Sequence, residues 1–180
     1  MSLYWKPLIT ITRVLAYMLK KTDDDGMDLY FTISQEKHNA KTSSELVQKL
    51  QGKACRGTSE IGSRLSTILH QYQMYLQEPV PNRRSLFGKA KPKAKKALNV
   101  YILTDAIWQP HSDATEPIAS LIAMLKKLDY PRKQVGIQFI RFGNDPGGID
   151  KLEYLDSGLG LPWYVLSRRH RGGTWEFLRS

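Results

Sequence analysis

A short apolar run, Val100–Leu103, constrains the fold of this chain more than any other feature. None of its residues is charged, so the run predicts a strand that is covered on both faces. Residues 118–128 then place apolar side chains at helical spacing, and residues 135–142 return to a strand pattern. Asp145 and Pro146, a cap residue and a proline suited to the first helical position, open a last helix. Strands that alternate with helices predict an α/β fold with right-handed crossovers.

The first half of the chain supplies further helices and one more strand. Residues 5–20 form a predicted helix with apolar side chains around much of its circumference, and the Asp-rich segment of residues 22–26 ends it. Residues 27–33 alternate apolar and polar side chains as a strand does. We expect a short helix at residues 43–51, opened by a serine cap, and a longer one at residues 59–77.

Basic residues outnumber acidic ones, 27 to 17, and the excess of ten is concentrated at two places. Seven Lys and Arg residues without any acidic residue lie in the loop of residues 79–97, and the segment from Arg168 to the C-terminus carries the rest of the excess. The remaining chain is neutral, so the charge belongs to a loop and a tail and not to the body of the fold. Prolines and a glycine in the loop exclude regular structure over most of its length.

The basic loop is a candidate anion-binding segment, because clustered lysines attract phosphate groups by a salt-sensitive term. It offers one aromatic residue, Phe87, for stacking on bases. A solvated insertion without a ligand is the alternative interpretation, and we favour it. The candidate anion-binding residues are Arg83, Arg84, Lys89, Lys91, Lys93, Lys95 and Lys96.

The single cysteine, Cys55, excludes an intrachain disulfide. The first residues lack both the charged beginning and the small-residue cleavage site of a secretory signal. Lys6, Arg13 and Lys20 interrupt the most hydrophobic stretch, so no apolar run reaches the roughly 18 residues that cross a bilayer. We therefore expect an intracellular protein, cytoplasmic or nuclear, without a membrane span.

Asp105 lies where chemistry is expected in an α/β fold, directly after a buried strand. Thr58 and Ser59, a loop threonine and a candidate helix cap, belong to a loop that precedes a helix and would face the same edge. A carboxylate and hydroxyl oxygens are ligands suited to Mg²⁺. The alternative, which spacing alone favours, is that the two hydroxyl residues cap a helix and Asp105 begins a turn.

Taken together, several segments resemble a von Willebrand factor A domain of the type common in fungal multidomain proteins. They occur in the family's order and cover about residues 4–160. Each segment alone is weak, but the ordered series is fairly specific. The matching segments are Trp5, Asp25–Phe31, Arg56–Thr58, Asn99–Asp105, Val135–Phe139, Gly143–Gly147 and Leu155–Gly160.

The resemblance implies a three-layer, Rossmann-like fold, in which helices flank a mostly parallel sheet. It implies one domain over residues 1–163, with residues 79–97 as a basic loop insertion. The last helix of this domain is expected to end at Gly158 or Gly160. Residues 164–180 form a basic tail that differs from the family's final strand and helix.

Members of this family hold a divalent cation at the top of the sheet, in a metal-ion-dependent adhesion site. Its ligands come from an Asp-x-Ser-x-Ser signature, a threonine and an aspartate, and by position Thr58 matches that threonine and Asp105 that aspartate. The signature and the strand before it are missing from this sequence. We expect a degenerate site and no cofactor, and Mg²⁺ or Mn²⁺ would bind only if the missing signature were supplied.

The missing strand is central in the family's sheet and would pair with neighbours on both sides. Without it, two interior edges keep unpaired N–H and C=O groups, each of which costs on the order of 1–3 kcal/mol when buried. We expect the sheet to close up, to rearrange or to borrow a strand from another chain. A truncated or incompletely predicted gene product would explain such a sequence.

Other motifs fail on inspection. Gly57–Arg64 has the glycine spacing of a phosphate-binding loop but lacks its lysine and its preceding strand. A calcium loop that began at Asp23 would require a glycine where Asp28 stands. No Gly-x-Ser-x-Gly elbow occurs, and the four histidines have no ligand-like spacing. We therefore predict no enzyme.

The sequence favours a protein–protein interaction module that engages a protein partner through the top edge of its sheet. Exposed strand edges favour self-association or strand donation by the partner. The alternative function is phosphate or nucleic-acid binding by residues 83–96 and the arginine-rich tail.

Overall fold

Two separate sheets and five α-helices form the part of the chain that the computed structural model describes, residues 2–20, 25–53, 59–79, 95–109, 111–158, 165–171 and 174–177. The helices are α1 (Trp5–Leu19), α2 (Ser43–Gln51), α3 (Ile61–Gln77), α4 (Thr115–Lys127) and α5 (Pro146–Glu153). Shorter helical turns are η1 (Ser2–Tyr4), η2 (Arg132–Gln134) and η3 (Tyr154–Gly158). The strands are β1 (Met27–Phe31), β2 (Ser34–Ala40), β3 (Leu98–Thr104), β4 (Val135–Arg141), β5 (Val165–Arg171) and β6 (Thr174–Phe177).

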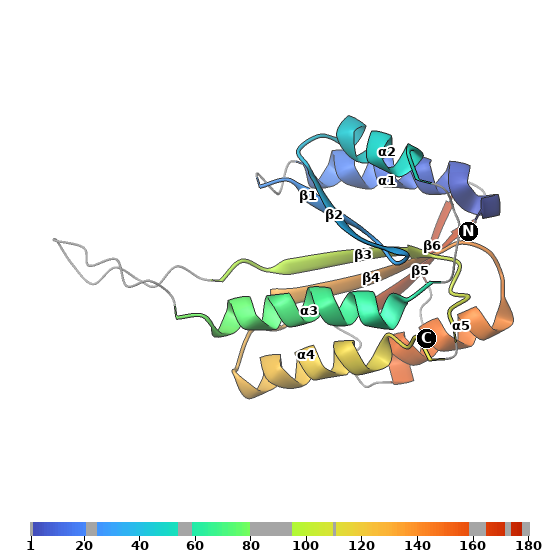
Figure 1. The fold of residues 1–180 in the computed structure, drawn as a ribbon. Coiled ribbons are helices and arrows are strands. Elements are labelled where there is room, and N and C mark those ends of the chain that lie inside the picture. The colour runs from blue at the N-terminus through green and yellow to red at the C-terminus, as the bar shows by residue number, and fades with distance from the viewer. Residues whose placement is uncertain are drawn as a thin grey trace.

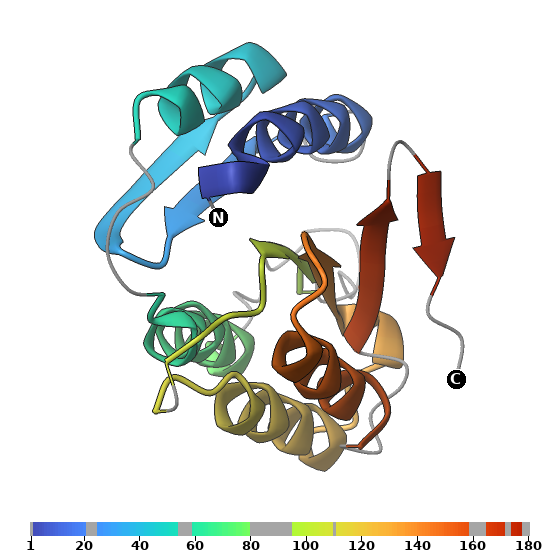
Figure 2. The same ribbon diagram turned by 90° about the vertical axis from the view of Figure 1, so that its right-hand side faces the viewer.

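The larger sheet has the order β3-β4-β5-β6. Strands β3, β4 and β5 are parallel, and β6 returns antiparallel to β5. The smaller sheet is the antiparallel hairpin of β1 and β2, which stands apart from β3 in both views (Figures 1 and 2). We call residues 2–53 the N-terminal lobe and residues 59–177 the C-terminal lobe. The fold is therefore mixed α/β, with its parallel strands in the C-terminal lobe.

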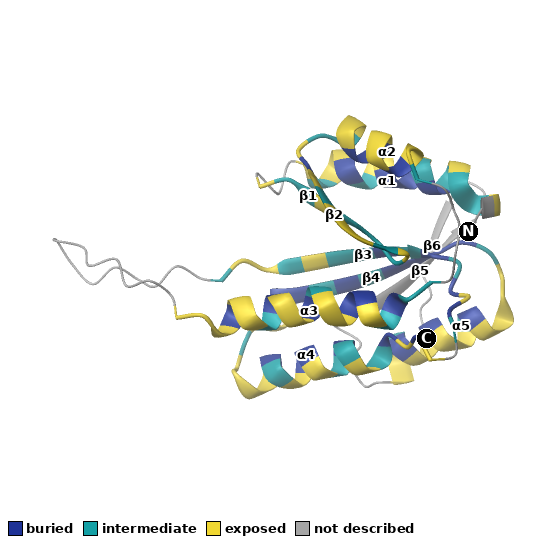
Figure 3. Cartoon of the chain, viewed as in Figure 1, coloured by how far each residue is buried: buried dark blue, intermediate teal, exposed yellow. Residues whose placement is uncertain are grey.

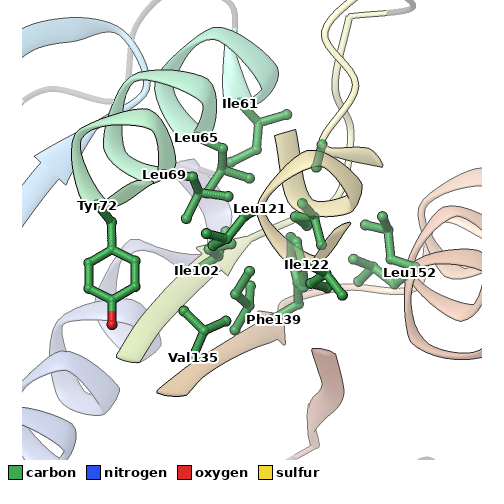
Figure 4. Packing of buried hydrophobic residues seen from close by; sticks show 14 of the residues in the cluster. Ile61, Leu65, Leu69, Tyr72, Ile102, Leu121, Ile122, Val135, Phe139 and Leu152 are labelled. Carbon is green, nitrogen blue, oxygen red and sulfur yellow. The ribbon is translucent and has the colours of Figure 1, made fainter. Parts of the chain in front are cut away.

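The main hydrophobic core lies between the parallel strands and helices α3, α4 and α5 (Figure 4). Ile137 and Phe139 on β4 are fully buried, and so are Leu121 and Leu125 on α4. Burial of such side chains stabilises the fold by about 1.5–3 kcal/mol each.

A second hydrophobic cluster covers the opposite face of the sheet, beneath α1 (Figure 1). Leu8 and Ile11 of α1 pack with Ile140 and Phe142 at the end of β4. The partly buried side chains of the same cluster come from η1, α1, β1 and β3: Tyr4, Trp5, Ile9, Leu15, Leu29, Phe31, Tyr101 and Leu103. Helices therefore lie on both faces of β3 and β4.

The helices and strands predicted from periodicity are confirmed, with ends that differ by a few residues. Asp145 caps α5, as predicted, by accepting a hydrogen bond from the backbone N–H of Gly148. The predicted strand at residues 27–33 ends earlier, at Phe31. A second strand, β2, follows it after a short turn, and the sequence analysis missed this strand. Residues 165–171, which we assigned to the tail, form a strand that pairs with β4.

Both predicted serine caps are wrong. Thr42, and not a serine, caps α2, because its hydroxyl accepts a hydrogen bond from the Glu45 N–H (3.2 Å). Ser59 does not cap α3, since the residue at the cap position is Glu60 and no side chain of that residue bonds the helix. The Ser59 hydroxyl donates instead to Thr32 Oγ1 (3.3 Å), after β1.

Within the described residues, no helix combines the length and the hydropathy that crossing a membrane requires. Most of the basic loop, residues 80–94, lies outside the described residues, and so do Thr58 and Cys55.

Candidate functional site

The carboxyl edge of β3 and β4 brings together the starts of several helices. The connection from β3 to α4, residues 105–114, forms the centre of this edge. Helix α3 begins against one part of the connection and α5 begins against another. The start of α1 also lies here, since an added Cβ at Gly143 would meet the Tyr4 hydroxyl at 2.6 Å. Loops that a rigid scaffold holds at this edge are where α/β proteins place their binding residues.

Helix α3 is fixed to the edge by contacts of its first turn. The Gly62 N–H donates to the Ser112 hydroxyl oxygen (3.1 Å), which therefore replaces a cap that the helix lacks in its own sequence. A Cβ at Gly62 would stand 2.3 Å from the Asp113 carbonyl oxygen, so only glycine allows this approach. The β3–α4 connection and the start of α3 are thus packed as one unit.

Helix α5 approaches the same connection from the other side. A Cβ at Gly148 would lie 2.9 Å from the Cβ of Ala106, which is fully buried. Ala106 adopts a left-handed backbone with φ of 60°, a conformation that costs a residue with a Cβ roughly 1–2 kcal/mol. Its N–H donates to Thr104 Oγ1 (2.9 Å), which holds the strained residue in place.

The turn that follows β3 exposes one large apolar side chain between two buried residues. Trp108 is buried, and its indole Nε1–H donates to Thr104 Oγ1 (2.9 Å). Ile107, between Ala106 and Trp108, is 61% exposed. The Asp105 carboxylate accepts the Ile107 N–H (3.3 Å), so it shapes the turn as the structural interpretation predicted. The buried neighbours therefore hold Ile107 and Asp105 in fixed positions.

Several carboxylates lie at this edge in the described residues, and the buried Arg141 at the end of β4 lies there too. Asp113 Oδ1 accepts hydrogen bonds from the Thr115 N–H (3.0 Å) and hydroxyl (2.8 Å) at the start of α4, and Asp145 caps α5. Glu60 Oε1 lies 3.4 Å from His111 Nε2. These carboxylates stand near helix N-termini, whose partial positive charge stabilises them.

The described residues do not assemble a metal site around Asp105. No group of three or more His, Cys, Asp or Glu side chains among them lies close enough to hold an ion. The predicted companion of Asp105, Thr58, falls outside the described residues, and so do the anion-binding candidates Arg83, Arg84, Lys89, Lys91 and Lys93. Among the described residues, Asp105 is thus the one predicted metal ligand whose surroundings can be seen, and its carboxylate supports the turn after β3.

The amino edge of the same strands carries the opposite charge. Lys95 and Lys96 precede β3, and their carbonyl oxygens accept hydrogen bonds from the Gln134 side chain (3.3 and 3.1 Å). Gln134 directly follows Arg132 and Lys133, which line a shallow open depression beside β4. The main chain of two predicted anion-binding residues, Lys95 and Lys96, thus lies beside a helical turn with a second basic pair that the sequence analysis did not select. The Lys95 ammonium donates to the Tyr75 carbonyl, and the Lys96 ammonium pairs with Asp25.

A buried tyrosine anchors this basic edge. The Tyr72 hydroxyl of α3 donates to the Lys96 carbonyl oxygen (2.7 Å) and accepts from Gln134 Nε2 (2.7 Å). Burial raises the pKa of the Tyr72 phenol above its ordinary value. Lys95 extends over the Tyr75 ring, with its Nζ 4.5 Å from the centroid.

Sequence reasoning missed Ser112, Ile107 and Gly148 as parts of the carboxyl edge. Gly148 carried a signal, because it lies three residues after a cap and inside a helix. Ser112 and Ile107 carried none, since their positions follow from contacts with segments far away in the chain.

Comparisons with known proteins do not assign the chain. No family model matches it, and neither curated proteins nor solved structures include a match.

Proposed function

We propose that the chain is a protein-interaction module related to the von Willebrand factor A domain, with a degenerate metal-ion-dependent adhesion site. The observation that carries the proposal is the exposed Ile107 beside Asp105 on a turn whose neighbours, Ala106 and Trp108, are buried. A rigidly held apolar side chain next to a carboxylate, at the carboxyl edge of parallel strands, suits contact with another protein.

The arrangement of the elements supports the family assignment without depending on a metal. Parallel strands β3, β4 and β5 alternate with helices, and helices lie on both faces. The hairpin of β1 and β2 stands apart from β3, so the sheet has not closed up by pairing these two strands. The separation also favours a contact with a second protein or a second copy of the chain.

Site-specific photo-crosslinking tests the proposal. We expect Ile107→benzoylphenylalanine to capture discrete protein adducts in the cells of origin, identified by mass spectrometry. Leu128→benzoylphenylalanine is the matched control, because Leu128 is also exposed but follows α4 at the opposite end of the sheet. Adding Asp105→Asn should reduce the Ile107 adducts about tenfold, the loss expected for one charge-assisted contact. Equal adducts at both positions, or none at Ile107, would refute the proposal. Chelation of divalent cations should leave the adducts unchanged.

Anion binding at the amino edge is a second candidate. The observation that favours it is the position of the main chain of Lys95 and Lys96 against Gln134, which directly follows Arg132 and Lys133. Binding to single-stranded DNA or polyphosphate should weaken steeply with salt and should be lost when residues 83–96 are deleted. The same deletion should leave the Ile107 adducts intact, so the two candidates are separable.

A further inference from the structure

One edge of β3 is paired and the other is not paired with any described strand. The Phe142 N–H donates to the Thr104 carbonyl (2.9 Å), which continues the β3–β4 ladder and shows that Thr104 turns its backbone groups to β4. Because backbone groups alternate in direction along a strand, every second residue before Thr104 also faces β4. The residues whose N–H and C=O face the unpaired edge are therefore Asn99, Tyr101 and Leu103.

Strand β1 lies across from this edge and runs in the same direction as β3. At the amino ends, Lys96 before β3 contacts Asp25 before β1 (Nζ to Oδ2, 2.7 Å). At the other end, Thr32 after β1 contacts Ser59, at the start of α3 on the carboxyl edge. Leu29 and Phe31 of β1 share a hydrophobic cluster with Tyr101 and Leu103 of β3, although no ladder joins the two strands.

Helices enclose the interval between β1 and β3 on both faces. On one face, Leu8 and Ile11 of α1 belong to the cluster that includes both strands. On the other face, α3 reaches both sides, since Leu65 packs with Ile102 of β3 and the Arg64 guanidinium lies 5.0 Å from the Tyr30 ring centroid. The buried Arg64 also donates to the Glu36 carbonyl of β2 (2.7 Å). A strand in this interval would therefore meet apolar side chains on the α1 face, and on the α3 face it would meet Leu65 and Ile102 next to β3 and the Arg64 guanidinium next to β1.

The burial of β3 reflects its missing neighbour. Ile137 and Phe139 of β4, a strand with partners at both edges, are 0% exposed. Val100, Tyr101 and Leu103 of β3 have helices on the same two faces and are only partly buried (Figure 3). A further strand at the unpaired edge would reduce this exposure.

We propose that the unpaired edge of β3 accepts an extended segment of a partner protein, parallel to β3 and apolar on both faces. The proposal rests on the proposed interaction function and names the chemistry of the partner segment. Main-chain hydrogen bonds to Asn99, Tyr101 and Leu103 supply affinity, and the two apolar faces select against charged segments. The segment matches β3 in length, 7 residues.

A peptide of the chain's own residues 134–142 is a suitable probe, because this segment pairs parallel to the other edge of β3 and feeds both hydrophobic clusters. We expect the fluorescently labelled peptide to bind the whole protein saturably in anisotropy titrations. A control peptide with Ile137→Asp and Ile140→Asp, one change on each face, should bind at least about tenfold more weakly.

Residue-resolved amide exchange by NMR locates the binding. In the free protein we expect slow exchange at Val100, Ile102 and Thr104, which are paired with β4, and faster exchange at Asn99, Tyr101 and Leu103. The probe should slow the second set about tenfold and leave the first set unchanged. Protection elsewhere, or no binding, overturns the proposal. If amide protection at the unpaired edge rose with protein concentration in the absence of peptide, the edge would pair with a second copy of the chain. That result would overturn the proposal of a different partner protein.

A backbone variant gives an independent arm. Tyr101→Pro removes one N–H from the unpaired edge and none from the β3–β4 ladder, so it should weaken peptide binding about tenfold. Tyr101→Val, which keeps the N–H and the strand preference, is its matched control and should bind within about threefold of the wild type. Equal binding by both variants overturns the proposal. A failure of the peptide experiments together with specific Ile107 adducts would reject this edge and keep the interaction function.

Discussion

Strands β4 and β1 carry similar apolar side chains and differ in how deeply these are buried. Phe139 on β4 is fully buried, whereas Phe31 on β1 is partly exposed (Figure 3). Both strands have a helix above them, so helix cover does not explain the difference. What differs is the neighbouring strands: among the strands that the structure describes, β4 pairs at both edges, whereas β1 pairs with β2 alone. The comparison shows that apolar side chains and a covering helix do not bury a strand completely. Both edges of the strand must also be paired.

The contacts between the two lobes differ from the contacts within the C-terminal lobe. Within the C-terminal lobe, close-packed apolar side chains connect every helix to the sheet. Between the lobes, polar contacts supplement the cluster beneath α1: Arg64 with Glu36, Ser59 with Thr32 and Lys96 with Asp25. The exposed Lys96–Asp25 pair is worth about 0–1 kcal/mol, and apolar side chains of the N-terminal lobe such as Phe31 are only partly buried. We therefore expect the N-terminal lobe to tolerate changes that the C-terminal lobe does not.

Deleting a buried ring in each lobe gives the largest expected contrast. Phe139→Ala should lower the free energy of unfolding by about 3–5 kcal/mol, because it leaves a cavity between the parallel strands and their helices. Phe31→Ala should lower it by only about 1–2 kcal/mol, because its ring is already partly solvated. Urea denaturation followed by circular dichroism measures both. Equal losses would show that β1 is packed as tightly as β4 and would break the comparison.

Adding one methyl group to a glycine in each lobe tests tightness directly. Gly62→Ala forces a Cβ against the Asp113 carbonyl and should cost about 1–3 kcal/mol. Gly52→Ala, after α2, meets its nearest atom at 3.6 Å with a backbone that alanine adopts, and should change stability by less than about 0.5 kcal/mol. Thermal denaturation distinguishes the two. A neutral Gly62→Ala would mean that the start of α3 can shift away from the β3–α4 connection.

Tyr72 should make the free energy of unfolding depend on pH in the alkaline range. Its folded-state pKa is raised by burial, so its contribution to stability is complete below the unfolded pKa of about 10 and is lost as the pH rises through the higher folded value. Tyr72→Phe should therefore lose less stability than the wild type between about pH 8 and pH 11. Unfolding free energies of both proteins at the two pH values measure the difference. If the two proteins lost the same unfolding free energy between these pH values, the raised pKa of Tyr72 would be contradicted.

Glu36 should make a small contribution to stability that is lost at acidic pH. Its pKa is lowered chiefly by the hydrogen bond from Lys53, so the stabilising ion pair is present above the ordinary carboxyl pKa and is lost as the pH falls through the lowered one. Lys53→Met should raise the Glu36 pKa toward its ordinary value in an NMR titration. Lys49→Met, on exposed α2, is the control and should leave it unchanged. Added salt should shrink the wild-type shift, since the pair is exposed.

The elements with regular hydrophobic spacing could be predicted from the sequence. Val100 and Ile102 of β3 share a core with the stripe of α4, whereas Tyr101 and Leu103 belong to the cluster beneath α1. The apolar patterns of these two elements therefore report their burial. Strand β2 could not be predicted in this way, because Gln35, Glu36 and Lys37 are all exposed and no apolar alternation exists. Cross-strand polar contacts hold it instead, such as Asn39 to Asp28 (2.9 Å).

Two residues of the carboxyl edge were predictable: Asp105, from its position after a buried strand, and Asp145, from its position before Pro146 at the start of a helix. The hydroxyl that completes the start of α3 comes from Ser112, on a segment distant in the sequence, and no local pattern indicates it. The metal assignment rested on a pairing of Asp105 with Thr58 that the described residues do not test. Long-range contacts, and not local preferences, therefore determine most of this site.

The separation of the two sheets also bears on the order in which the chain folds. The ladder of the hairpin joins Met27 to Ala40, whereas the ladder between β3 and β4 joins Leu98 to Val135 across α4 and its connections. Closing the shorter loop costs less conformational entropy, so local elements of the N-terminal lobe have the lower contact order. We expect the hairpin to form early and the parallel sheet to set the folding rate, since the long closure must precede its hydrogen bonds.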